Sequence, residues 1–352
     1  MPGGLRTGEG IAIAAVAAAA AVTAVLELSG ATDVVVFAAS AIALAGLAWV
    51  VSFATEAIGE RLGPAATGVL QSTLGNLPEL FIVLFALSAG EIVVAKFSIL
   101  GSLFANALLV LGLVIVAGAS RSSDRVMRFH ARLPNDTATL LLLATFVIVI
   151  LGASNSVGDR ASEHQVAISV IGALVLLSIY AAFLLSYLRG GGEPPSAARP
   201  RVATWVAVSL LAVSGIGAAL ASEWFVGSLD GAIERLGISR AFAGLVIAAI
   251  AGNAVENVAG IVLAAKRQND LAISVVKNSV AQIAVFLLPV LVLLSLLFEE
   301  RLTFVVGPVY IAALALTAIA MWQVTGDGQA AIFEGWALVG FYVVLATLTW
   351  FE

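Results

Sequence analysis

Residues 71–79 read QSTLGNLPE, and residues 252–257 read GNAVEN. Both stretches are polar, and both interrupt long apolar runs in the chain. Each contains the dipeptide Gly-Asn followed within a few residues by one glutamate, Glu79 in the first stretch and Glu256 in the second. The fold of this chain therefore has to accommodate two carboxylates in the middle of apolar sequence.

The composition around these motifs is typical of a membrane protein. Of the 352 residues, 61% are hydrophobic and only 11% are charged, whereas soluble domains average about 25% charged residues. Lipid is the solvent that suits so much apolar sequence, and backbone in lipid has to satisfy its own hydrogen bonds. The chain has no cysteine and two histidines, which excludes a disulfide framework and argues against a His-rich metal site.

We expect an all-α polytopic protein with about 11 transmembrane helices, because a span needs roughly 20 mostly apolar residues. The first run, Ile11–Leu28, also has the length of a cleaved signal peptide, but we interpret it as a helix that stays. The predicted spans cover residues 10–28, 34–56, 64–88, 92–118, 137–153, 166–188, 202–222, 240–265, 271–297, 302–322 and 331–350.

The distribution of Lys and Arg predicts the orientation, because cytoplasmic loops are enriched in both. A cytoplasmic N-terminus puts eleven of them inside and five outside, with Lys277 left out because it lies within a span. We therefore expect the N-terminus inside and the C-terminus outside, in a bacterial-type plasma membrane. The basic segment Arg121–Arg132 is interpreted as a topology signal that touches anionic lipid headgroups.

The two polar motifs belong to an internal repeat with an offset of 177 residues. Gly75, Asn76 and Glu79 align with Gly252, Asn253 and Glu256, and Ser102 aligns with Ser279. A repeat of five spans is odd in number, so its second copy enters the membrane from the opposite face. The predicted domains are an N-terminal helix (1–33), a first five-helix repeat (34–188), a Gly/Pro cytoplasmic linker (189–201) and a second, inverted five-helix repeat (202–352).

The repeated motifs supply the ligands that a hard cation needs. A carboxylate in mid-membrane costs about 2.5–3.5 kcal/mol on insertion scales, so something has to compensate for it. Calcium takes six to eight oxygen ligands from carboxylates, amides, backbone carbonyls and water. The predicted ligands are Glu79, Glu256, Asn76, Asn253, Gly75 and Gly252, where the glycines and Pro78 loosen their helices.

Charge suggests how such a site works, because one divalent cation or two protons neutralise two carboxylates. A second layer of polar residues is expected around the site or in proton coupling. Its members are Ser72, Ser102, Asn106, Asn257, Lys277, Asn278, Ser279 and Gln282. The serines also suit interhelical packing, and Lys277 also suits a buried ion pair with a glutamate.

The chain resembles the calcium/cation antiporter superfamily, and within it the cation/proton exchangers. The resemblance rests on GNLPEL at 75–80, GNAVEN at 252–257 and the NSVAQIA stretch at 278–284. It implies that the glutamate of each motif binds the transported calcium and exchanges protons. The chain departs from the family pattern at Pro78, Asn257, Lys277 and Asn278, where the family usually has other residues.

Three functions stay open at this point. The first is calcium/proton antiport by alternating access, with Ca²⁺ and H⁺ as the transported ions, no cofactor, no nucleic-acid partner and the lipid bilayer as surroundings. The second is a sodium-coupled or monovalent-cation exchanger of the same fold, which Pro78 and Lys277 suggest. The third is a membrane binding or structural protein that does not transport. An enzyme is not expected, because the spans lack a cysteine nucleophile and a His-rich metal cluster.

Overall fold

The computed structural model describes residues 5–59, 74–130, 132–189 and 202–352, and these residues are almost entirely helical. Nine helices in this part of the chain are long and apolar enough to cross a membrane. The number is ten if the bent pair Leu229–Leu236 and Arg240–Gly252 forms one span. The expected all-helical membrane fold is confirmed, whereas the count of 11 spans stays a prediction.

The first half of the chain is built from helices of very different length. Because α5, η1 and α6 follow one another without a break, they form one span over Ile92–Ala119. The elements are α1 (Thr7–Leu28), α2 (Asp33–Gly59), α4 (Leu77–Ser88), α5 (Ile92–Phe104), the π-helical η1 (Ala105–Val110), α6 (Leu111–Ala119), the strand β1 (Val126–Arg128), α7 (Arg132–Val157), the 3-10 helix η2 (Arg160–His164) and α8 (Gln165–Arg189).

The second half contains two more π-helical turns, η3 and η4. Its elements are α9 (Thr204–Gly227), α10 (Leu229–Leu236), α11 (Arg240–Phe242), η3 (Ala243–Ala248), α12 (Ala249–Gly252), α13 (Ala254–Ala265), α14 (Asn269–Gln282), η4 (Ile283–Leu287), α15 (Leu288–Leu294), the 3-10 helix η5 (Ser295–Leu297), α16 (Pro308–Thr325), the strand β2 (Gln329–Ala331) and α17 (Ile332–Trp350).

Two predicted spans of the second half are interrupted or shortened in the structure. The span predicted at 240–265 is interrupted at Asn253, which separates α12 from α13. The span predicted at 302–322 begins at Pro308, because proline favours the first turn of a helix and does not extend it backwards. In the non-helical segment before Pro308, the backbone amides of Leu302 and Phe304 donate to the hydroxyl groups of Ser295 and Ser169.

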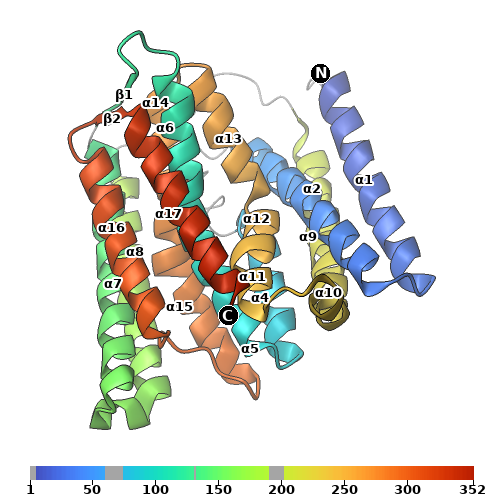
Figure 1. Cartoon of the computed structure of the whole chain (residues 1–352). Helices are drawn as coiled ribbons and strands as arrows, with labels where there is room; N and C mark the ends of the chain where they lie inside the picture. Colours follow the sequence, from blue (N-terminus) through green and yellow to red (C-terminus); the bar gives the residue numbers. More distant parts are fainter. Residues whose placement is uncertain (1–4, 60–73, 131, 190–201) are drawn as a thin grey trace.

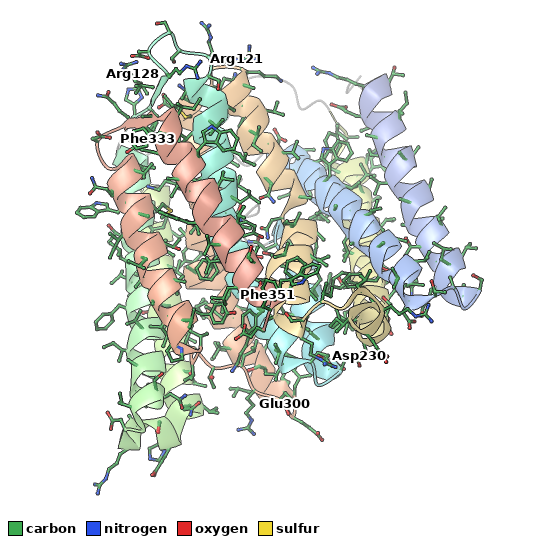
Figure 2. The ribbon with its side chains drawn as sticks, in the orientation of Figure 1. Arg121, Arg128, Asp230, Glu300, Phe333 and Phe351 are labelled. Carbon is green, nitrogen blue, oxygen red and sulfur yellow. The ribbon has the colours of Figure 1, made fainter. Side chains whose placement is uncertain are left out.

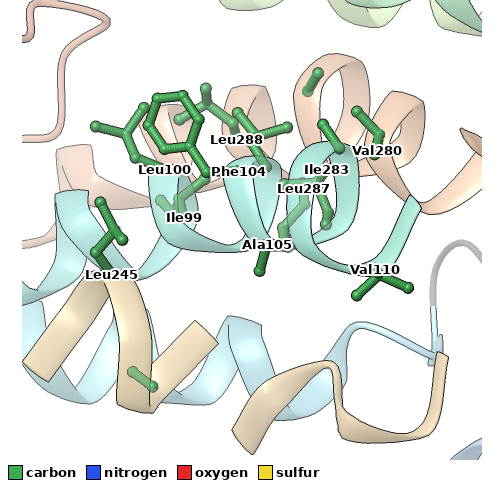
Figure 3. Packing of buried hydrophobic residues seen from close by; sticks show 14 of the residues in the cluster. Ile99, Leu100, Phe104, Ala105, Val110, Leu245, Val280, Ile283, Leu287 and Leu288 are labelled. Atoms are coloured by element: carbon green, nitrogen blue, oxygen red, sulfur yellow. The ribbon is translucent and has the colours of Figure 1, made fainter. Parts of the chain in front are cut away.

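The core lies where the long central helices meet. Gly101 of α5 allows two backbones to approach closely, because a Cβ there would lie 2.2 Å from the carbonyl oxygen of Leu245 in η3. Figure 3 shows the packing on the other side of α5, where Phe104 lies beside Leu288 of α15. All of these apolar side chains are buried. The fold thus holds α5 between η3 and η4, near the polar motifs.

The two ends of the helical bundle differ in their contacts. Arg121 and Arg128 lie at the end that also holds the N-terminus, and Asp230 and Glu300 lie at the opposite end (Figures 1 and 2). At the first end β1 pairs antiparallel with β2, so the loop after α6 is joined to the α16–α17 hairpin. A hydrogen bond from Arg128 keeps the pKa of the exposed Asp124 below its usual range.

The N-terminal helix α1 stands at the edge of the molecule (Figure 1). It packs mainly on α2, and only 6% of its most apolar window is buried inside the protein. Its closest fit is at Gly46 of α2, where a Cβ would lie 2.9 Å from Cγ2 of Val16. The remaining surface of α1 is apolar, as expected for a helix that faces lipid.

Candidate cation site

The first polar motif forms the start of a helix in the middle of the molecule. Gly75 and Asn76 form a turn, and α4 begins at Leu77 with Pro78 in its first turn. The backbone of Asn76 (φ −90°, ψ 13°) is not helical, so the helix of the span predicted at 64–88 is interrupted at this point. Glu79 therefore lies in the first turn of α4, where backbone N–H groups favour a negative charge.

The second motif interrupts its helix in the same way. The backbone of Asn253 (φ −107°, ψ 11°) is not helical, and it separates α12 from α13. Gly252, the last residue of α12, lies directly against Glu79: a Cβ on Gly252 would be 2.7 Å from Cγ of Glu79. Both helices are interrupted at the motifs, in agreement with the expectation that Gly75, Pro78 and Gly252 loosen them. The contact brings Gly252 of the second motif against Glu79 of the first, whereas an approach of Glu79 to Glu256 stays a prediction.

Glu79 is the centre of a buried polar cluster, and its side chain is 2% exposed. Its Oε1 accepts hydrogen bonds from the hydroxyl of Ser102 in α5 and from Nδ2 of Asn253. The Asn253 amide also lies within 2.8 Å of the Ser102 hydroxyl oxygen. Nδ2 of Asn106 donates to the Ser102 carbonyl at 3.0 Å and to Oδ1 of Asn253 at 3.3 Å. These four side chains come from both halves of the sequence.

The cluster is rich in oxygen, as a hard cation requires. Oδ1 of Asn106 is buried and has no hydrogen-bond partner among the described residues. Oδ1 of Asn257, one turn into α13, is in the same situation within this part of the chain. Because a buried polar atom without a partner costs about 1–3 kcal/mol, such oxygens favour a ligand that can complete their coordination.

The remaining predicted residues fall into three groups. Glu256 lies in the first turn of α13, three residues after Asn253, and its side chain lies outside the described residues, as does Ser72. In the second group, Asn76 and Ser279 are buried. In the third group, Gly75 and Gln282 are partly exposed and Asn278 is exposed. A contact between any of these residues and a transported ion stays a prediction.

Lys277 is buried, and its ammonium donates a hydrogen bond of 2.6 Å to the hydroxyl of Thr325. Thr325 is the last residue of α16, so the positive charge lies at the C-terminal end of that helix. The unsatisfied carbonyl groups there make this end of a helix favourable for cations. Lys277 thus links α14 to α16.

Replacement of Thr325 by Val is expected to destabilise the protein, because the buried ammonium loses one acceptor at nearly constant side-chain volume. We expect a loss of about 1–3 kcal/mol, seen as a lower midpoint of thermal unfolding in detergent. The matched control is Thr347→Val on the exposed face of α17, where the hydroxyl bonds only within its own helix in the structure. Equal midpoints for both variants would contradict a stabilising role of the Lys277–Thr325 contact.

The sequence as a whole matches a known family. The family model described as "Sodium/calcium exchanger protein" covers residues 32–188 and 206–351. The chain belongs to this exchanger family. The two matched segments take in both polar motifs and all four residues of the Glu79 cluster. The family resemblance seen in the sequence is therefore confirmed.

Relatives within the exchanger family are full-length matches. The Ca(2+)/H(+) antiporter of Aphanothece halophytica is 30% identical over 344 residues, with 91% of each chain covered. The Ca(2+)/H(+) antiporter ChaA of Bacillus subtilis is 32% identical, covering 89% of this chain and 91% of the relative. These relatives are transporters by name, in agreement with the prediction that the chain is not an enzyme.

Solved structures of exchangers have the same fold. The structure of native YfkE superposes with a TM-score of 0.81 at 29% identity, covering 96% of this chain and 98% of that chain. A structure titled H+/Ca2+ exchanger CAX superposes with a TM-score of 0.77 at 17% identity, covering 97% of this chain and 89% of that chain. At 17% identity, the second likeness supports the fold alone.

Proposed function

We propose that the chain exchanges Ca²⁺ for protons across a membrane by alternating access. The observation that carries the proposal is the buried carboxylate of Glu79, which contacts Ser102 of the first half and Asn253 of the second half. The relatives named as Ca(2+)/H(+) antiporters, at about 30% identity over nearly the whole chain, support Ca²⁺ and H⁺ as the two exchanged ions.

The proposed mechanism follows from the cost of buried charge. Glu79 and Glu256 together carry two negative charges, which one Ca²⁺ or two protons neutralise. Burial disfavours the ionised carboxylates, whereas a bound cation favours them. The site is then low in free energy when it is loaded with Ca²⁺ or doubly protonated, and high when it is empty and charged. Conformational change restricted to the neutral states produces exchange.

The inverted repeat is part of the proposal, and the spacing of the elements supports it. Helix α4 covers 77–88 and α13 covers 254–265, so both their starts and their ends are 177 residues apart. Helices α5 and α14 start at 92 and 269, with the same offset. A π-helical turn follows each of them, at 105–110 and at 283–287. Transporters with inverted repeats bind their ions near the membrane midplane, where the repeats meet.

The proposed sidedness places the N-terminus and the arginine-rich end in the cytoplasm of a bacterial-type cell, with the C-terminus outside. The support is the excess of Lys and Arg in the segments counted as cytoplasmic, together with the position of Arg121 and Arg128 at one end of the bundle (Figure 2). Positive residues collect on the cytoplasmic side of membrane proteins.

Cation competition in proteoliposomes tests the proposed ions. With a pH gradient and no sodium, external Ca²⁺ is expected to accelerate proton flux in a saturable manner, while equal concentrations of Na⁺ and K⁺ leave it unchanged. The proton flux with Mn²⁺, compared with the flux with Ca²⁺, measures the selectivity among divalent cations. Calcium flux that requires sodium and no pH gradient would instead support a sodium-coupled exchanger. Absence of flux under every cation gradient, with folded protein in the vesicles, would support a protein that does not transport.

A further inference from the structure

An apolar groove of about 460 Å³ lies between α16 and α17. Leu316, Ile319 and Ala320 of α16 line it from one side, and Phe341 and Val344 of α17 line it from the other. Leu316 and Val344 are 65% and 66% exposed, so the groove opens on the outer surface of the bundle. In a chain that spans a membrane, this surface faces acyl chains.

The groove has a polar end. Gln323 lines the apolar groove and also a second hollow of about 370 Å³, whose other lining residues are Trp322, Gly326 and Asp327. This hollow lies where α16 ends, at the level of the β1–β2 pair. Exposed Trp322 and Trp336 lie near this end of their helices, as expected at a headgroup level. The two hollows together have the polarity profile of a phospholipid.

The charge at the polar end selects the headgroup. Asp327 is the one charged residue that lines the second hollow in the described part of the chain. Its Oδ1 accepts a hydrogen bond of 3.0 Å from the backbone of Gln329, which fixes the orientation of the exposed carboxylate. A carboxylate held in this way favours a headgroup that carries a primary ammonium and disfavours a purely anionic one.

The bottom of the groove connects it with the cation site. Leu108 lines the groove and belongs to η1, the π-helical turn that also contains Asn106. Asn106 donates to the Ser102 carbonyl and to Asn253, as described for the Glu79 cluster. Both α16 and α17 pack on η1. An acyl chain in the groove therefore rests on the turn that positions a residue of the site.

We propose that this groove binds one phospholipid whose acyl chain lies between α16 and α17, with an ammonium-bearing headgroup beside Asp327. Phosphatidylethanolamine has this chemistry. The bound chain supports η1 from the membrane side. The effect on transport rests on the proposed exchange function, whereas lipid binding itself does not.

Lipid retention is measured first, by native mass spectrometry of protein titrated with phosphatidylethanolamine in detergent. We expect one tightly held lipid per chain in the unmodified protein and about tenfold weaker retention in Ala320→Phe, whose ring fills the groove. The matched control, Ala181→Phe, adds the same ring to the exposed surface of α8 and is expected to retain the lipid. Equal retention by all three proteins would overturn the proposed site.

The headgroup is tested with Asp327→Asn. The unmodified protein is expected to prefer phosphatidylethanolamine over phosphatidylcholine and phosphatidylglycerol by about tenfold, the range of one charge-assisted hydrogen bond. The variant is expected to bind all three lipids alike. Preference for phosphatidylglycerol, or an unchanged preference in the variant, would overturn the assigned headgroup.

A second copy of the chain is the competing occupant of the groove. Leu316→Cys in membranes is expected to form no disulfide cross-link through the groove under oxidising conditions and to react with a lipid-soluble thiol reagent; efficient disulfide-linked dimers would overturn the lipid assignment. In proteoliposomes, exchange is expected to be severalfold faster with phosphatidylethanolamine than with phosphatidylcholine, and insensitive to this change in Ala320→Phe. Equal exchange rates in both lipids, together with selective lipid binding, would refute the proposed effect of the lipid on transport through η1. The proposed lipid-binding site would still stand.

Discussion

Glu79→Gln is expected to abolish exchange while leaving the protein folded. The glutamine carbonyl oxygen accepts the same two hydrogen bonds, from Ser102 and from Asn253, so the buried cluster keeps its geometry. What disappears is the negative charge. Removing one partner of a buried charge pair costs about 3–5 kcal/mol, so we expect calcium transport driven by a pH gradient to fall by about 150- to 4,000-fold.

The measurement is calcium uptake into acid-loaded inverted vesicles, with protein amount and thermal unfolding checked in parallel. Glu27→Gln is the matched control, because it removes the same charge from an exposed position near the end of α1. Glu256→Gln is expected to behave like Glu79→Gln if both carboxylates bind the ion. Full transport by Glu79→Gln would refute the mechanism that relies on its charge.

Gly252→Ala is expected to have the second-largest effect, for a steric reason. The added methyl group would lie 2.7 Å from Cγ of Glu79, a distance that carbon atoms do not tolerate without movement. Glu79 has little freedom to move, since it is buried and held by Ser102 and Asn253. Overpacking of this kind costs about 1–3 kcal/mol, which corresponds to about a 5- to 150-fold loss in apparent calcium affinity or transport rate.

Gly227→Ala serves as the control for this substitution. Gly227 ends α9, and a Cβ there would meet no atom within 4 Å. The two variants therefore add the same methyl group to a helical glycine with and without a neighbour. Transport by Gly252→Ala at the level of Gly227→Ala would mean that the Gly252–Glu79 contact does not position the carboxylate.

The sequence predicted the membrane class and singled out the four residues of the buried Glu79 cluster, because polar residues in apolar helices are costly and therefore informative. Gly75, Pro78 and Gly252 indicated that both helices are loosened at the motifs. Ser102 and Asn106 were predicted as a second layer, and both belong to the Glu79 cluster. For these residues, residue type and spacing carried enough information.

Other features of the structure could not be predicted from the pattern of polar and apolar residues in the sequence. The π-helical turns η1, η3 and η4 consist of ordinary apolar residues, and tertiary packing decides whether such residues form an α- or a π-turn. The segment before Pro308 reads as apolar helix, yet its amides bond to Ser169 and Ser295 from elsewhere in the chain. The repeat also suggests equal roles for Gly101 and Asn278, whereas Gly101 packs tightly on Leu245 and Asn278 is exposed.

The peripheral position of α1 determines how freely its sequence can drift during evolution. A helix that mainly faces lipid is constrained by its length and hydrophobicity, and exchanges among alanine, valine and leucine preserve both. The exception is the meeting point of Val16 with Gly46, where shape matters as well. Across homologous genes, we therefore expect rapid apolar turnover along Thr7–Leu28 and correlated change at these two positions.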